Sequence, residues 1–232
     1  MKNTLSLFLL SALLLFPKLG ESQINEDKLG AWYMCFFNTT INESSWGFQG
    51  DIQYRNWNMG GDLEQLLLRG GLTFKPKQAN IKFTMGYGNI TSGEYGSGNA
   101  TSSESRIYQE ALFPTQLGKR FFINHRLRYE QRFVENQNLR TRYRYNFFLN
   151  IPINNTTLNY KTVYLALYNE IFINGERSIG NGNTVETFDR NRLYIGAGYV
   201  IKKGWKVQVG LLNQTTNGWK KNQLQFSFHQ KF

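Results

Sequence analysis

Residues 139–151 read LRTRYRYNFFLNI, and two kinds of side chain alternate along them. Bulky apolar residues take every second position from Tyr143 to Ile151, and arginine or asparagine takes the positions between, from Arg140 to Asn146. Successive side chains of a β-strand point to opposite faces of the sheet, so this pattern predicts a strand with one apolar and one cationic face. The alternation is long compared with the roughly 5–6 residues usual for a strand of a soluble protein.

The same alternation recurs along the chain and predicts an all-β fold. Eleven segments carry it: residues 29–37, 46–57, 63–75, 81–89, 103–113, 120–133, 139–151, 160–174, 188–201, 204–215 and 220–232. Most of them reach the roughly 9–11 residues with which a tilted strand crosses a bilayer. Single-chain bacterial barrels normally have an even number of strands. We therefore expect an antiparallel transmembrane β-barrel of twelve strands, with ten as the alternative.

The connections between these segments alternate in length. Short turns are expected at Pro76, at 114–118, at 152–156 and at 202–204, whereas longer polar loops are expected at 89–102 and 175–187. Outer-membrane barrels have short periplasmic turns and longer outer loops. The chain is therefore expected to end at the periplasmic side, with the two long loops outward.

The N-terminus has the features of a secretory signal peptide. Lys2 precedes an apolar run from Leu5 to Phe16, and the small residues Gly20 and Ser22 resemble a cleavage site. The run is shorter than the roughly 20 residues of a spanning helix, which argues against the alternative, a membrane anchor. We expect residues 1–22 to be removed, leaving a single domain over 23–232 with a net charge of +10. Its lone cysteine, Cys35, cannot form an internal disulfide.

The position of the apolar face decides between a soluble and a membrane barrel. After residue 22 the chain has no apolar run of 18 residues, and its mean hydropathy is −0.47, so spanning helices are excluded. Strand lengths and connection lengths favour lipid outside the barrel. So do the terminal apolar residues, Leu224, Phe226, Phe228 and Phe232, which look like the signal read by the barrel assembly machinery. We expect the cell outer membrane, in contact with its lipid and lipopolysaccharide.

Four segments carry a resemblance to a known family: SRIYQE at 105–110, HRLRYEQRF at 125–133, LRTRYR at 139–144 and DRNRLY at 189–194. With them the chain resembles an uncharacterised family of small porin-like bacterial outer-membrane β-barrels, classed as a domain of unknown function. The resemblance implies an outer-membrane barrel and no established activity. One departure is Gln230, which is polar where the assembly signal usually continues the apolar series.

Arginine dominates the polar faces of the predicted strands. With the apolar faces toward lipid, nine arginines and four glutamates point into the lumen. The arginines are Arg106, Arg126, Arg128, Arg132, Arg140, Arg142, Arg144, Arg190 and Arg192, and the carboxylates are Glu104, Glu110, Glu130 and Glu170. If 134–138 links a hairpin, the opposed pairs are Arg132 with Arg140, Glu130 with Arg142, and Arg128 with Arg144.

This cluster supports two classes of function. Rings of arginine attract and select anions, which indicates a small porin-like channel for anionic solutes. The alternative is a non-conducting structural or adhesion barrel, held together by salt bridges in its lumen. Directly opposed arginines are unfavourable unless water or anions screen them, so in either case we expect water or anions in that space.

Other chemistry has weaker support. Ser227 and His229 share a face, but a barrel hydrolase also needs an oxyanion site and an orienting group, and the other histidine, His125, is placed on the lipid face. No group of ligands has metal-site spacing, and no cofactor motif occurs. Nucleic-acid binding is disfavoured because aromatic residues and arginines occupy opposite strand faces. We therefore predict neither an enzyme nor a metal or nucleic-acid site.

Overall fold

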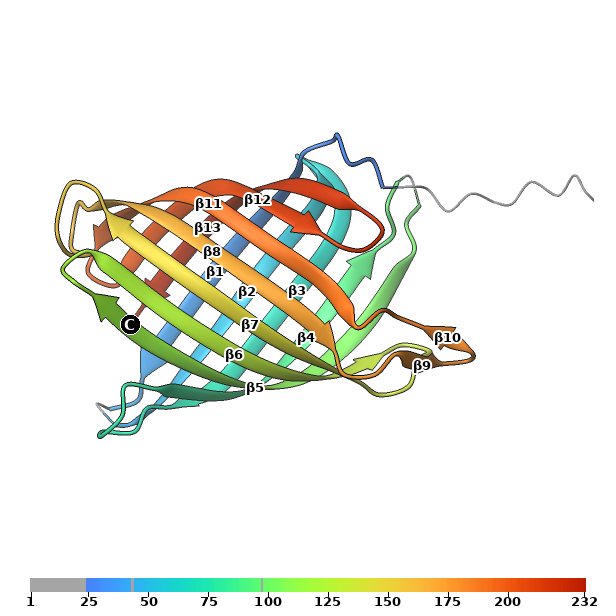
Figure 1. The fold of residues 1–232 in the computed structure, drawn as a ribbon, viewed down its shortest axis with the longest axis horizontal. Helices are drawn as coiled ribbons and strands as arrows, with labels where there is room; N and C mark the ends of the chain where they lie inside the picture. Colours follow the sequence, from blue (N-terminus) through green and yellow to red (C-terminus); the bar gives the residue numbers. More distant parts are fainter. Residues whose placement is uncertain (1–23, 43, 97) are drawn as a thin grey trace, which may run out of the picture.

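The computed structural model describes residues 24–42, 44–96 and 98–232. Over these residues the chain forms a closed β-barrel with tilted strands (Figure 1). The predicted signal peptide, residues 1–22, lies outside the described residues. None of the described residues belongs to a helix long and apolar enough to cross a membrane.

Eleven of the strands that the described residues form close the barrel, and two more form a small hairpin. The barrel strands are β1 (Gly30–Thr40), β2 (Trp46–Asn58), β3 (Gly61–Phe74), β4 (Lys82–Gly93), β5 (Thr101–Leu117), β6 (Phe121–Val134), β7 (Arg140–Pro152), β8 (Val163–Asn174), β11 (Phe188–Lys202), β12 (Trp205–Thr215) and β13 (Lys220–Lys231). The hairpin consists of β9 (Ser178–Gly180) and β10 (Asn183–Thr184). All eleven predicted segments therefore correspond to barrel strands.

The prediction of twelve or ten antiparallel strands is wrong in two respects. From β1 to β13, each barrel strand pairs antiparallel with the next barrel strand. The barrel closes between β1 and β13, which pair parallel, with Gly30 opposite Gln223 and Asn38 opposite Lys231. With an odd number of antiparallel strands, the first and the last run in the same direction. The barrel can then close only through a parallel pair, so the fold is a mixed barrel.

The two ends of the barrel carry different connections. The end where β1 begins, here the N-terminal end, carries both predicted long loops, and the end where β13 stops, the C-terminal end, carries all the predicted short turns (Figure 1). The loop 175–187 contains the β9–β10 hairpin, whose turn residues Asn181 and Gly182 both have positive φ, as the Asn-Gly turn of a hairpin requires. The difference in length is smaller than predicted, because 153–162 at the C-terminal end is also long.

Most of the side chains buried inside this barrel are polar or charged, and its outer face is apolar. Met85 is 65% exposed and Leu193 is 57% exposed on the outer face, whereas Glu130 on the inner face is 1% exposed. One side of the lumen holds an aromatic cluster that includes Trp32, Tyr164 and Tyr194. Glycine makes room for these rings: a Cβ at Gly198 would lie 2.1 Å from Cζ of Tyr164. The lumen therefore has an aromatic wall, formed from β1, β8, β11 and β12, and a charged wall formed from β5–β8.

Candidate binding site in the lumen

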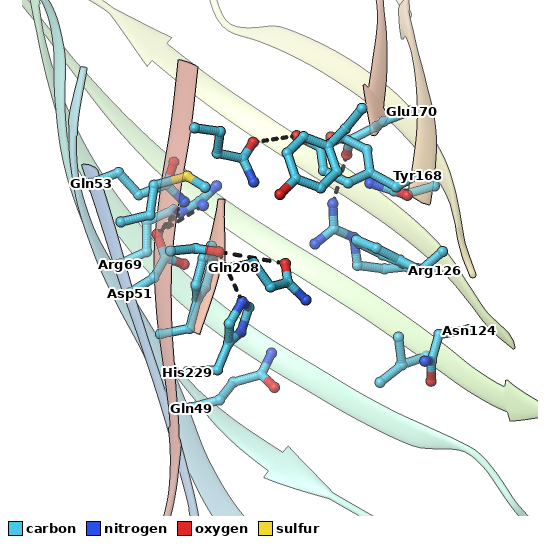
Figure 2. Close-up of a pocket in the computed structure, with 18 of the residues that line it drawn as sticks. Gln49, Asp51, Gln53, Arg69, Asn124, Arg126, Tyr168, Glu170, Gln208 and His229 are labelled. Carbon is cyan, nitrogen blue, oxygen red and sulfur yellow. Dashed lines mark hydrogen bonds and ion pairs between the residues drawn. The ribbon is translucent and has the colours of Figure 1, made fainter. Parts of the chain in front are cut away.

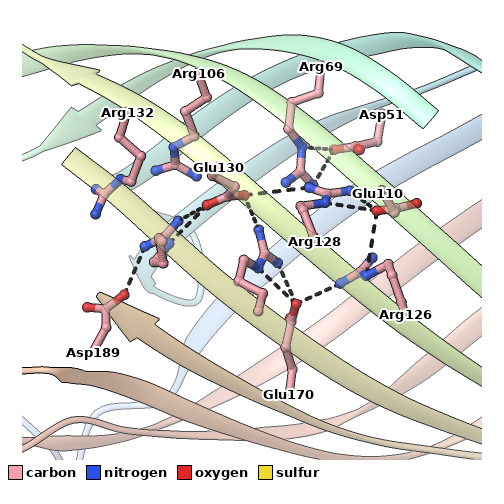
Figure 3. A network of polar contacts seen from close by, with 12 residues as sticks. Asp51, Arg69, Arg106, Glu110, Arg126, Arg128, Glu130, Arg132, Glu170 and Asp189 are labelled. Atoms are coloured by element: carbon pink, nitrogen blue, oxygen red, sulfur yellow. Dashed lines mark hydrogen bonds and ion pairs between the residues drawn. The ribbon is translucent and has the colours of Figure 1, made fainter. Parts of the chain in front are cut away.

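The strand alternation turns the nine predicted arginines and the four predicted glutamates inward. Most of them are buried, among them Arg142 at 3% exposed and Glu170 at 4% exposed. The register predicted for the β6–β7 hairpin is confirmed, because Arg132 pairs with Arg140, Glu130 with Arg142, and Arg128 with Arg144. Residues from β5, β6, β7, β8 and β11 therefore meet in the lumen (Figure 3).

Glu130 is at the centre of this arginine–carboxylate network. Arg142 donates to its Oε2 from Nε and Nη2, at 2.9 and 2.6 Å. Arg144 donates to its Oε1 from Nη1 at 2.6 Å. Two guanidinium groups from β7 thus share one carboxylate from β6, which explains how cationic side chains can crowd together on neighbouring strands.

Each of the other three predicted glutamates also accepts hydrogen bonds from arginine. Glu170 on β8 accepts from Arg144 at 2.6 Å and from Arg126 at 2.7 Å. On β5, Glu110 accepts from Arg128 at 2.6 Å. Glu104, on the same strand, accepts from both Arg106 and Arg132, at 2.6 Å each. The carboxylates bridge arginines from neighbouring strands, so the predicted salt-bridged lumen is present.

The network contains residues that the sequence analysis missed. Asp51 on β2 pairs with Arg69 on β3 at 2.8 Å, and Asp189 on β11 pairs with Arg142 at 2.8 Å. Strict alternation along the strand would put Asp189 on the opposite face from Arg190. A register shift between Phe188 and Arg190 instead lets both side chains reach the network. Asp51 and Arg55 could have been predicted from the alternation in β2. Asp51, Gln53 and Arg55 occupy every second position and therefore share the inward face.

A cavity of about 320 Å³ lies beside the network, between the charged and the aromatic walls (Figure 2). Trp32, Tyr168 and Tyr194 line its aromatic side. Eight cationic side chains also line it, among them Arg126, Arg128, Lys82 and Lys206, together with the carboxylates of Asp51, Glu110 and Glu170. This cavity shares Asn38, Lys82 and Leu112 with a second cavity at the C-terminal end of the barrel, so it adjoins that mouth. Its size is at the lower end of the range for small-molecule sites, about 300–1,000 Å³.

Four arginines separate the 320 Å³ cavity from a smaller one in the lumen. They are Arg55, Arg69, Arg144 and Arg192, which line both cavities. They come from β2, β3, β7 and β11, so they reach into the lumen from well-separated parts of the wall. We call these four side chains the arginine partition. The arginine partition thus lies between the cavity that adjoins the C-terminal mouth and the smaller cavity.

Ser227 and His229 lie in the same cavity, as their shared strand face predicted. His229 Nε2 lies 3.2 Å from Ser227 Oγ, and the His229 ring stacks on Phe36. Among the described residues, no carboxylate hydrogen-bonds to His229, so the orienting group of a catalytic triad is not in place. His125 lies on the outer face, where it contacts the Tyr145 hydroxyl at 2.8 Å. The described residues also contain no cluster of His, Cys, Asp or Glu that could hold a metal ion.

The predicted assembly signal lies on the strand that closes the barrel. Leu224, Phe226 and Phe228 on β13 alternate with buried lumen residues such as Gln225, and Phe232 is 70% exposed at the chain end. These positions put an apolar stripe on the outer face beside β1. Whether an assembly machinery reads this stripe remains a prediction.

Residues 29–225 match the family described as "Protein of unknown function (DUF2490)". The match covers ten of the barrel strands completely and reaches into the last one. Neither the curated proteins nor the solved structures gave a match to this chain. The description of the family gives no activity, no location and no ligand. The lumen is therefore the feature of this chain that indicates a function.

Proposed function

This chain belongs to the family described as "Protein of unknown function (DUF2490)", and we propose that it is an outer-membrane β-barrel that binds small anionic solutes in its lumen. The solutes enter the 320 Å³ cavity from the C-terminal end of the barrel. The arginine partition holds the resting lumen closed to free diffusion.

The polarity of the two barrel faces carries the membrane part of the proposal. A soluble barrel buries apolar residues inside, but here most of the buried residues are polar or charged and the outer face is apolar. Leu127, Leu193 and Ile195 are all more than half exposed on that face. The strands are also long enough to cross a bilayer, since the shortest barrel strands have 11 residues. Lipid is the solvent that such an outer surface requires.

Heat modifiability after detergent extraction tests the membrane part. A lipid-facing barrel extracted from the outer-membrane fraction should migrate faster on a gel before boiling than after it. A protein that is released without detergent, or that migrates identically with and without boiling, would contradict the membrane assignment.

The composition of the cavity carries the binding part. Eight cationic side chains line the space, Arg126, Arg128, Lys82 and Lys206 among them, against three carboxylates, Asp51, Glu110 and Glu170, and aromatic rings line it as well. Guanidinium groups bind carboxylates and phosphates through paired hydrogen bonds, and aromatic rings pack against apolar groups. The cavity therefore suits a solute that has an anionic group and a compact apolar body.

Calorimetric titration with 1-naphthoate tests the binding part on the protein in detergent. We expect naphthoate to bind and 1-naphthylmethylammonium, which has the same ring and the opposite charge, not to bind. Arg126→Gln should weaken naphthoate binding by about 10-fold or more, because a hydrogen bond to a charged group contributes about 1.5–3 kcal/mol. Arg120→Gln, at the turn between β5 and β6, is the control and should leave the affinity unchanged. Equal binding of the two probes, or no binding of either, would reject anion recognition by this cavity.

A porin-like anion channel is the second candidate, and the excess of arginine over carboxylate in the lumen favours it. Conductance measured in planar lipid bilayers distinguishes the closed, solute-binding barrel from the channel. With the partition in place we expect no steady open conductance from the wild-type protein. A steady anion-selective current that Arg142→Glu together with Arg144→Glu shifts toward cations would instead establish the channel.

A further inference from the structure

The smaller cavity of the lumen is surrounded by arginine. It has a volume of about 40 Å³, and its lining consists of Gln65, Leu67, Phe172 and eight arginines: Arg55, Arg69, Arg106, Arg132, Arg142, Arg144, Arg190 and Arg192. No carboxylate lines it. The carboxylates that pair with these arginines, such as Glu104 and Glu130, therefore lie behind the guanidinium groups rather than in the cavity.

Two of these arginines have no carboxylate partner among the described residues. Arg55 is 5% exposed and donates only to Gln53 and Gln65. Arg192 is 6% exposed and donates to Gln214. Both stack on Trp32, with their guanidinium carbons 3.9 and 4.7 Å from the ring centroid. Stacking and amide bonds hold the two groups in place, but they do not neutralise the charge.

A buried cation without a counter-charge is strongly destabilising, because transfer from water removes its hydration. Here two buried cations that form no ion pair share the cavity with six further guanidinium groups. The buried carboxylate of Glu64 accepts from Trp32 Nε1 at 2.7 Å, but it does not line the cavity and pairs with neither arginine. A bound anion would supply the missing charge at the point where these groups converge. The cavity has room for it, since about 10–15 Å³ of such volume holds one water molecule and 40 Å³ therefore holds about three.

The size and the donors favour a tetrahedral oxyanion. A phosphate or sulfate occupies roughly the space of a few water molecules and offers acceptor oxygens in every direction. Guanidinium groups bind such oxygens through paired N–H donors, and eight residues of this type surround the space. A single halide would accept fewer of these hydrogen bonds, and a larger organic anion would not fit.

We propose that the 40 Å³ cavity binds a free inorganic oxyanion, phosphate or sulfate, as the counter-ion that completes the arginine–carboxylate network. This site is distinct from the 320 Å³ cavity. The inference stands whether or not the larger cavity binds a solute.

Thermal unfolding of the wild-type barrel in detergent tests the site. Sodium sulfate or phosphate is titrated at constant ionic strength against sodium chloride, and the fraction of heat-resistant barrel is read on a gel. We expect the midpoint to rise along a saturating curve with oxyanion and not with chloride. Sulfate also stabilises proteins generally through exclusion from their surface, but that effect grows without saturation. An unchanged midpoint, or an equal rise with chloride, would overturn the proposal.

Matched variants assign the effect to the cavity. Arg55→Gln and Arg192→Gln should each shift the saturating curve to higher oxyanion concentration, and the double variant should lose it. Arg140→Gln is the control: Arg140 is another buried arginine without an ion pair, but it does not line the cavity. Its curve should match the wild type, and loss of the curve in this variant as well would contradict a local site.

Direct location of the ion covers the case in which the double variant does not fold. Wild-type crystals grown with sodium selenate should show an anomalous selenium peak among Arg55, Arg106, Arg142 and Arg192. A cavity that holds only water under these conditions would overturn the proposal.

Discussion

Arginines stand directly opposite one another in the lumen because carboxylates from adjacent positions separate their charges. Arg128 lies across from Arg144, and Glu130 lies one inward position further along β6, where it accepts from Arg144 and from Arg142. At 1% exposed, Glu130 has almost no contact with water. Its charge is therefore balanced by arginine alone, whereas Arg142 and Arg144 also pair with Asp189 and Glu170, respectively.

Glu130→Gln should destabilise the barrel strongly. The neutral amide cannot balance Arg142 and Arg144, and removal of one partner of a buried pair costs about 3–5 kcal/mol. Glu186→Gln is the control, since its partner Arg177 is 3.7 Å away and both side chains are mostly exposed. Urea unfolding from lipid vesicles, followed by tryptophan fluorescence, measures both. Equal midpoints for the two variants would show that the network is hydrated and not structural.

Leu149→Arg tests the outer face at the level of one residue. Leu149 points outward from β7 between Ile123 and Leu167, so an arginine there would enter the bilayer. The expected cost is about 2–4 kcal/mol near the midplane. Asn150→Arg, at the next position, points into the 320 Å³ cavity and should cost much less. If insertion into vesicles tolerates Leu149→Arg but not Asn150→Arg, the barrel has the opposite polarity.

The sequence predicted which residues line the lumen better than it predicted their partners. A short link between two alternating segments fixed the β6–β7 register, and so the opposition of Glu130 to Arg142. Arg55 and Arg192 could not be recognised as neighbours in this way. Their meeting on Trp32 depends on β1 lying between β2 and β13, a contact between the two ends of the chain.

At the scale of the strands, the β1–β13 pair is the feature that alternation cannot predict. The eleven segments were found from local patterns, but which strands close the barrel is a long-range property. The usual even number argued for a twelfth strand, and the parallel pair makes that strand unnecessary. In the structure the two strands match residue by residue from Gly30 to Asn38.

A cysteine cross-link tests this pairing. Cys35, the chain's single cysteine, lies opposite Phe228. Adjacent strands are about 4.8 Å apart, which is within the Cα separation that a disulfide spans. Phe228→Cys should therefore give an intramolecular disulfide on oxidation, seen as a thiol-dependent shift on a denaturing gel. Leu193→Cys on β11 is more accessible from outside than position 228 but distant from β1 in the strand order, and it should give none. A strand inserted between β1 and β13 would abolish the cross-link.

For the molecule as a whole, the odd strand number separates the ends of the chain. β1 starts at the N-terminal end of the barrel, together with the loop 94–100 and the β9–β10 hairpin, and β13 stops at the other end (Figure 1). The 320 Å³ cavity adjoins the C-terminal end. If the barrel spans the outer membrane as we propose, its orientation decides from which side solutes reach the cavity.

We expect the C-terminal end to face the periplasm and the β9–β10 hairpin to face outward. An epitope inserted between Asn181 and Gly182, at the tip of that hairpin, should be labelled by antibody on intact cells. The same epitope inserted between Thr156 and Thr157, in the connection between β7 and β8, should be labelled only after the outer membrane is opened. Both sites lie in connections outside the barrel wall, so neither insertion interrupts a ladder of strand hydrogen bonds. Because the strand count is odd, an epitope after Asp27 should be labelled together with the hairpin and not with the β7–β8 connection. Labelling of the β7–β8 site alone on intact cells would reverse the orientation and place the mouth of the cavity at the cell surface.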